Sequence, residues 1–80
     1  MDSFSKLKWR CRRGTKELDF LLENFLLNQF LCADKQEQLL FVELLDLQDS
    51  QLILYLLGDQ LPSTRELSHL VKKIRNQSVL

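Results

Sequence analysis

Apolar residues recur along this chain at the i, i+3, i+4 and i+7 spacing that is typical of amphipathic helices. The pattern predicts an all-α protein with one domain over residues 1–80 and five helices. We expect the helices near residues 4–12, 16–31, 35–46, 50–57 and 64–75. The side chains that we expect to be mostly buried are those of Leu21, Phe25, Leu44, Ile53, Leu56, Leu67, Leu70 and Ile74.

Polar residues and one glycine stand where helices should begin and end. Asp34 and Ser63 each precede a glutamate by three residues, which is the pattern of a capping box. Asp49 is a good N-cap for the fourth helix. Gly58 suits the C′ position after that helix, because glycine adopts positive φ without a steric cost. We expect the tail from Asn76 to fray.

Two helices carry apolar residues on more than one side. The fourth helix is almost wholly apolar from Leu52 to Leu57, which predicts that it is buried all round at the centre of the domain. In the second helix, Phe20 and Leu27 lie on a different side from the core face. We expect both sides to be buried between neighbouring helices. The alternative is an exposed apolar patch beside Arg13-Gly14, which would mark a protein interface.

Composition agrees with a helical domain. Of the 80 residues, 45% are hydrophobic, and glycine and proline are scarce. The formal net charge is zero, although six of the eleven basic residues lie in the first sixteen positions. A zero net charge makes generic nucleic-acid binding unlikely, while a local basic patch stays open. No apolar run follows the basic residues at the N-terminus, so we expect no secretory signal there. No apolar run reaches about 18 residues, so we expect no membrane insertion.

Residue types that carry enzyme chemistry are sparse. His69 is the only histidine, and we expect it on the surface, with no nucleophile, metal-ligand spacing or phosphate-binding loop to accompany it. We therefore expect no enzyme. Cys11 and Cys32 lack the spacing of a zinc site, and two free thiols fit a reducing, cytoplasmic setting. We expect both to be small core residues. A reactive Cys11, activated by neighbouring cations, is the alternative.

A charged stretch from Trp9 to Asp19 contains one glycine, with cations before it and carboxylates after it. Gly14 suits the C′ position that ends the first helix, and Thr15 or Gly14 can serve as N-cap of the next. Glu17 and Asp19 then fall in the first turn, where the helix dipole favours carboxylates. The side chains that we expect to cluster at this corner are those of Arg12, Arg13, Glu17 and Asp19.

This stretch resembles the R-G-x-x-E signature of the SdhE family, whose mitochondrial branch is succinate dehydrogenase assembly factor 2. The residues that carry the resemblance are Arg13-Gly14-x-x-Glu17, preceded by Trp9 and followed by Leu18 and Asp19. A second, weaker family motif is matched by Leu44-Leu45-Asp46, Asp49 and Leu52. Tyr55 stands where that motif commonly ends in Trp. The resemblance extends along the whole chain and implies a compact five-helix bundle.

The resemblance implies an FAD assembly factor, a chaperone for flavinylation. Such a factor binds the flavoprotein subunit of succinate dehydrogenase or fumarate reductase and promotes covalent attachment of FAD to that subunit's own histidine. The factor itself is expected to bind no cofactor stably. The residues implied to bind the partner are Arg13, Gly14, Glu17 and Asp19, flanked by Arg12 and Trp9. Arginine suits this role because its planar fork pairs with carboxylates or carbonyls, and glycine lets a backbone approach closely.

Two other interpretations stay open. The basic N-terminus fits a nucleic-acid-associated or regulatory module, and some family members have carried an antitoxin label. The corner could also be structural only, with Gly14 as a helix stop, Glu17 as a capping carboxylate and the arginines on a solvated face. Because Arg13 and Glu17 lie at a helix end outside the predicted core, we expect replacing either to cost about 0–1 kcal/mol of stability.

Overall fold

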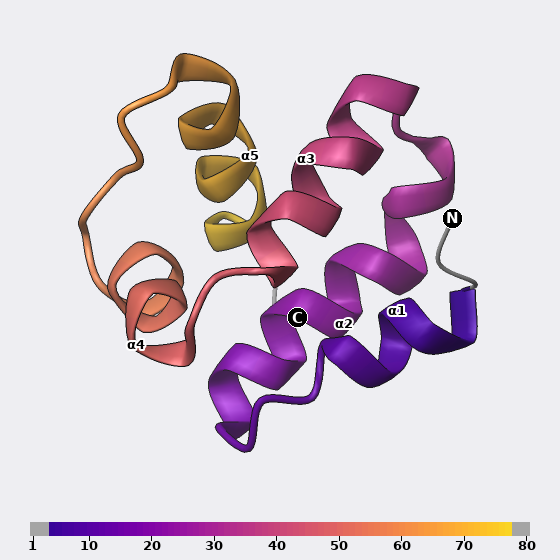
Figure 1. Ribbon diagram of the computed structural model, residues 1–80, viewed down its shortest axis with the longest axis horizontal. Coiled ribbons are helices and arrows are strands. Elements are labelled where there is room, and N and C mark those ends of the chain that lie inside the picture. The colour runs from indigo at the N-terminus through magenta and orange to yellow at the C-terminus, as the bar shows by residue number, and fades with distance from the viewer. Residues whose placement is uncertain (1–3, 78–80) are drawn as a thin grey trace.

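The computed structural model describes residues 4–77 and confirms an all-α fold without strands in that range (Figure 1). The five α-helices are α1 (Phe4–Arg10), α2 (Lys16–Asn28), α3 (Lys35–Leu45), α4 (Asp49–Leu52) and α5 (Arg65–Arg75). A 3₁₀ turn, η1 (Phe30–Cys32), follows α2, and a π-helical segment, η2 (Ile53–Leu57), continues α4. The five predicted ranges agree with these elements to within a turn at either end.

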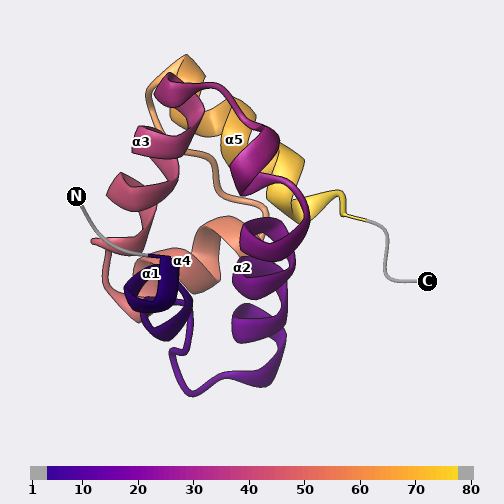
Figure 2. The same cartoon turned by 90° about the vertical axis from the view of Figure 1, so that its right-hand side faces the viewer.

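Helix α2 contacts α1, α5, η1 and η2, and Figure 2 shows it along one side of the bundle. Helix α3 packs against α5, and the segment formed by α4 and η2 closes the bundle between α2 and α5. Three phenylalanines lie at the centre. The ring of Phe41 is 4.9 Å from that of Phe25 and 5.5 Å from that of Phe30, measured between centroids. Contacts between tilted rings at this distance add to the stabilisation from burial.

Most of the predicted core is confirmed. The predicted residues that are buried are Phe25, Leu44, Leu56, Leu70 and Ile74. Leu21 and Leu67 are partly buried and pack against this core. The prediction for Ile53 is wrong, since 38% of this residue is exposed. The same error applies to the whole fourth predicted helix, for which burial on all sides is expected.

The segment formed by α4 and η2 is not buried all round as expected. Leu52 and Leu56 are buried, and η2 packs against α2 and α5. The apolar residues on the other side are more than a third exposed, namely Ile53, Leu54 and Leu57. An apolar side is buried only where a neighbouring element covers it, and the described chain supplies none there. Gly58 has φ of −97°, so it is not the left-handed C′ glycine we expected. Its N–H instead bonds to the carbonyl of Ile53, in keeping with the wider π turn.

The predicted helix starts are partly confirmed. Asp34 is the N-cap of α3, and its carboxylate accepts a hydrogen bond from the backbone N–H of Glu37 at 2.8 Å. The other two predictions are wrong by one residue. Gln48 is the N-cap before α4, so Asp49 is the first helical residue. Thr64, rather than Ser63, is the N-cap of α5, and it makes no side-chain capping bond.

The chain does not fray directly after α5. Gln77 is buried and its side-chain amide donates hydrogen bonds to the carbonyl oxygens of Leu21 and Ile74, at 3.0 and 2.9 Å. The side-chain oxygen of Gln77 accepts a hydrogen bond from the side-chain amide of Asn24 at 2.7 Å. These bonds fasten the end of α5 to α2. The expected fraying from Asn76 is therefore wrong for Gln77, and residues 78–80 lie outside the described range.

Candidate functional site

The link between α1 and α2 forms a corner, residues 11–15, that turns on one glycine. Gly14 has φ of +91°, the only positive φ in residues 4–77. Helix α1 already ends at Arg10, so Gly14 is not its C′ residue as expected, but part of the turn into α2. Thr15 is the N-cap of α2, as predicted, without a side-chain capping bond. No heavy atom lies within 4 Å of the point where a Cβ on Gly14 would stand. The glycine is needed for its backbone conformation, and the space beside it is open.

Asp19 holds the corner against the start of α2. Its carboxylate accepts a hydrogen bond of 2.6 Å from the backbone N–H of Arg13. A charged acceptor makes such a bond short and strong. Asp19 also donates its backbone N–H to the carbonyl of Thr15 at 2.8 Å, which begins the helical ladder. The first turn of α2 thus fixes the backbone that approaches Gly14.

The side chain of Arg13 points into the fold, and only 17% of it is exposed. Its Nη2 atom donates hydrogen bonds to the backbone oxygens of Leu45 and Leu47, at 2.7 and 2.8 Å. Its Nε lies 3.4 Å from the carboxylate of Asp49, as an ion pair rather than a hydrogen bond. Leu45 ends α3, and carbonyls at that point lack helical partners. Arg13 supplies the missing donors, so its side chain already has partners within the protein.

A second charged pair fastens the same two parts of the chain. Arg10, at the end of α1, pairs with the carboxylate of Asp46, which follows α3. Together with Arg13 and Asp49, this pair places the two sequence motifs side by side. The first motif supplies the cations, and the second supplies the carboxylates and carbonyl oxygens. The α1–α2 corner is therefore held by the α3–α4 connection.

Other predicted site residues face solvent. Glu17 is exposed in the first turn of α2, and its side chain makes no hydrogen bond or ion pair with any described residue. Trp9 is 72% exposed, and the guanidinium carbon of Arg12 lies 5.8 Å from the centre of its ring, a cation–π arrangement. Arg12 also forms an ion pair with Glu23 at 3.6 Å. The predicted cluster of four charges is therefore divided: Arg13 and Asp19 meet inside the corner, whereas Arg12 and Glu17 lie on its outer surface.

Beside the corner, α2 exposes apolar side chains. Phe20 is 46% exposed and Leu27 is 54% exposed. The expectation that neighbouring helices bury this side of α2 is wrong, because α1, α5 and η2 all pack elsewhere on the helix. The alternative of an exposed apolar patch is what the structure shows. A shallow hollow lies where this patch meets the corner, and its lining residues are Lys16, Glu17, Phe20 and Leu21.

The two cysteines differ. Cys11 is fully buried, and burial is the main cause that raises the pKa of its thiol from 9.0 to about 12. The charge of Glu23 raises this pKa further, while Arg13 lowers it. A neutral, buried thiol does not fit the reactive alternative, and the prediction of a core residue is confirmed for Cys11. That prediction is wrong for Cys32, which is exposed after α2 in η1.

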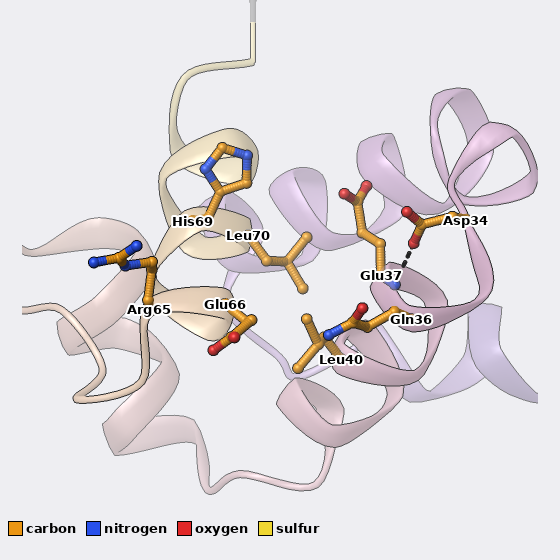
Figure 3. A pocket seen from close by; sticks show the side chains of 8 residues that line it. All are labelled: Asp34, Gln36, Glu37, Leu40, Arg65, Glu66, His69 and Leu70. Atoms are coloured by element: carbon orange, nitrogen blue, oxygen red, sulfur yellow. Dashed lines mark hydrogen bonds between the residues drawn. The ribbon is translucent and has the colours of Figure 1, made fainter.

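A groove between the starts of α3 and α5 holds the single histidine (Figure 3). His69 is exposed there, as predicted. The acidic residues beside it are Asp34, Glu37 and Glu66, and Lys73 already pairs with Glu37 at 2.9 Å. No serine or cysteine lines the groove, and no group of three metal-ligating residues occurs in the described part of the chain. None of the described helices is long and apolar enough to cross a membrane.

In this small helical bundle, a charged corner is braced by a second motif. The chain belongs to the family described as "Flavinator of succinate dehydrogenase", which matches residues 5–78. Similar proteins are the FAD assembly factors SdhE of Coxiella burnetii, Legionella pneumophila and Methylococcus capsulatus. No solved structure matches the chain significantly. These matches do not favour the nucleic-acid alternative.

The similarity extends over nearly the full length of this chain and of each relative. The Coxiella protein is 41% identical over 73 residues, which are 91% of this chain and 89% of the relative. The Legionella protein is 39% identical over 72 residues, 90% of each chain. The Methylococcus protein is 39% identical over 75 residues, 94% of this chain and 90% of the relative. The family assignment thus concerns the whole bundle and not the corner alone.

Sequence reasoning missed the residues that brace the corner. The sequence marks Arg10 only as one of the basic residues and does not predict that Asp46 and Asp49 pair with cations. A signal was present, because the second motif carries two carboxylates with no cation near them in sequence. Such unpaired carboxylates could have been matched with the cations of the first motif. The carbonyl oxygens of Leu45 and Leu47 left no signal, since every residue has one.

Proposed function

We propose that this protein is an FAD assembly factor that binds the flavoprotein subunit of succinate dehydrogenase or fumarate reductase and promotes covalent attachment of FAD to it. The observation that carries the proposal is the braced corner. Buried contacts of Arg13 and Asp19 hold the corner in place, while Glu17 has no partner among the described residues. The family description and the names of the relatives support the same function.

In this proposal, the residues on the outer surface of the corner contact the client, namely Trp9, Arg12, Gly14 and Glu17. The open space beside Gly14 allows a client backbone to approach closely, and the carboxylate of Glu17 can accept hydrogen bonds from a basic group of the client. Arg13 and Asp19 act differently from the other residues of the motif. They position the corner, and their contribution to binding is indirect.

The factor itself need not perform the chemistry. Covalent attachment joins the flavin to a histidine of the client, so the reacting groups belong to the flavin and the client. The factor contributes by binding one conformation of the client better than another, which shifts the client toward that conformation. On this proposal the protein is not an enzyme and holds no FAD stably. A cytoplasmic location stays a prediction.

A matched pair of glutamates tests the proposal. Glu17 and Glu66 are each exposed, and each is the second residue of its helix. In cells that lack the wild-type factor, we expect Glu17→Ala to stay folded by circular dichroism and to restore little covalent flavin, measured as in-gel fluorescence of the client. Glu66→Ala should restore it fully. Full restoration by both variants would contradict the proposal, as would unfolding of Glu17→Ala, which would make the residue structural.

A further inference from the structure

Three exposed apolar residues follow one another along α2 and η1. We call Phe20, Leu27 and Leu31 the α2 stripe; they are 46%, 54% and 72% exposed. Seven residues fall within about 20° of two full helical turns, so Phe20 and Leu27 project from the same side of α2. Leu31 follows four residues later, in the 3₁₀ turn at the end of the helix. The stripe lies opposite the buried face of α2, which is made of Leu18, Leu22, Phe25 and Leu26.

The α2 stripe is continuous with the outer surface of the corner. Glu17 precedes Phe20 by three residues, and both line the same shallow hollow at the start of α2. From this point the stripe extends along α2 toward η1. A partner that touches Glu17 therefore meets Phe20 within one helical turn.

Two asparagines beside the stripe are already hydrogen-bonded. Asn28 donates its side-chain amide to the side-chain oxygen of Asn24 at 2.7 Å and to the backbone oxygen of Asn24 at 3.0 Å. Asn24 in turn donates its amide to Gln77 at 2.7 Å. Covering a polar group costs most when it loses its hydrogen bonds to water without gaining others. Because these amides are bonded to one another, a partner can cover this side of α2 at little such cost.

The corner by itself is small for a stable interface. Specific complexes bury about 800 Å² on each partner, and their centres are apolar with polar rims. A client seated on the corner must therefore cover adjoining surface as well. Along α2, that adjoining surface is the stripe, with Glu17 at its edge.

We propose that the α2 stripe is the apolar centre of the client-binding surface. This inference rests on the proposed function and extends it beyond the charged motif. The partner that fits is a surface of the client flavoprotein with an apolar groove and a basic group at the end that meets Glu17. The N-terminal half of α2 carries three carboxylates, those of Glu17, Asp19 and Glu23, against one cation, Lys16, so a complementary partner is basic there.

A second copy of this chain fits the stripe less well. Two-fold pairing of the stripe with itself would bring the Glu17 end of one copy to the Leu31 end of the other. Residues 29–35 at that end carry one carboxylate, Asp34, and one cation, Lys35, so their formal charges cancel. Such a dimer would place no net positive charge against the acidic start of α2. The charges thus favour the client over self-association.

The test compares two exposed leucines in binding to the purified flavoprotein subunit. Leu27 lies in the stripe, and Leu39, 60% exposed on α3, lies outside it. We expect Leu27→Glu to weaken binding about tenfold or more, as for a residue at an interface centre. Leu39→Glu should bind within about twofold of the wild type, as for surface substitutions elsewhere. Leu31→Glu, at the most exposed stripe position, serves as a second variant if Leu27→Glu does not fold.

The outcomes separate this inference from the proposed function. If the wild type binds and supports flavinylation while the folded stripe variants bind equally well, the stripe is not part of the interface and only this inference fails. If the wild type does not bind the subunit at all, the proposed function fails too. A wild-type dimer that Leu27→Glu converts to monomers in sedimentation experiments would assign the stripe to self-association and overturn the inference.

Discussion

The guanidinium group of Arg13 donates a hydrogen bond of 2.8 Å to the backbone oxygen of Leu47, 34 residues away in sequence. A second bond of 2.7 Å reaches the oxygen of Leu45, the last residue of α3. The arginine of the first motif thus completes the end of a helix in the second. Its guanidinium group makes hydrogen bonds inside the bundle, whereas the side chain of Glu17, in the same motif, has no partner among the described residues.

This arrangement changes the stability expected for Arg13→Ala. The variant leaves two carbonyl oxygens without their charged donor, and such hydrogen bonds contribute about 1.5–3 kcal/mol each. We expect a loss of about 2 kcal/mol or more in the free energy of unfolding, measured by urea denaturation, in place of the small cost that sequence alone suggested. Arg12→Ala is the adjacent control, and it should lose at most about 0.5 kcal/mol, because Arg12 is 62% exposed. Equal losses in both variants would contradict this assignment.

Gly14 should resist replacement for a conformational reason. A residue with a Cβ is disfavoured at φ of +91°, so Gly14→Ala should cost about 1–2 kcal/mol although nothing nearby clashes with the added methyl group. D-Alanine at this position, introduced by chemical synthesis of the chain, prefers positive φ and should keep the wild-type stability. If the client backbone approaches Gly14 closely, the D-alanine protein will be stable yet bind the client poorly. Wild-type binding by that protein would argue against a close approach.

The two thiols should be distinguishable in solution. At pH 8 in the folded protein, we expect Ellman's reagent to modify one thiol, that of Cys32, because Cys11 is buried and its pKa is raised to about 12. In denaturant both thiols should react. A Cys32→Ser variant should show no fast reaction when folded. Rapid modification of Cys11 in that variant would contradict its burial.

The raised pKa of Cys11 also predicts that the free energy of unfolding depends on pH. The folded pKa of about 12 exceeds the unfolded value of 9.0, so the folded state keeps its proton where the unfolded state loses it. The stability that this group contributes is therefore fully present below pH 9.0 and is lost as pH rises toward 12. The difference in unfolding free energy between wild type and Cys11→Ala should shrink over this range. A constant difference would show that the thiol does not ionise with a raised pKa.

Salt should act mainly on the association rate with the client. Six basic residues lie in the first sixteen positions, and those exposed on α1 and in the corner are Lys6, Lys8 and Arg12. If these cations steer the approach of an acidic region of the client, raising salt will slow association more than it speeds dissociation. Stopped-flow or surface-based kinetics at low and high salt measure both rates. Association rates that do not change with salt would show that the cations do not steer.

The sequence by itself determined the number of helices, their approximate ends and most of the core. Helical periodicity is a local property, so the face with Leu70 and Ile74 could be assigned without knowing its neighbours. The Asp34 cap is likewise local, because its bond reaches only three residues along the chain. The positive φ of Gly14 and the surface position of Glu17 also followed from residues close by in sequence.

Only the tertiary structure decided which apolar faces are covered and where the long charged side chains point. Ile53, Phe20 and Leu27 are apolar residues on helices, yet they are exposed because no other helix packs on their side. Helical periodicity depends on one helix alone and does not show which other helices pack against it. Arg13 could reach solvent or the interior with equal ease, since its side chain is long and flexible. The choice depended on unpaired carbonyl oxygens at the end of α3, and these come near Arg13 only when the bundle is assembled.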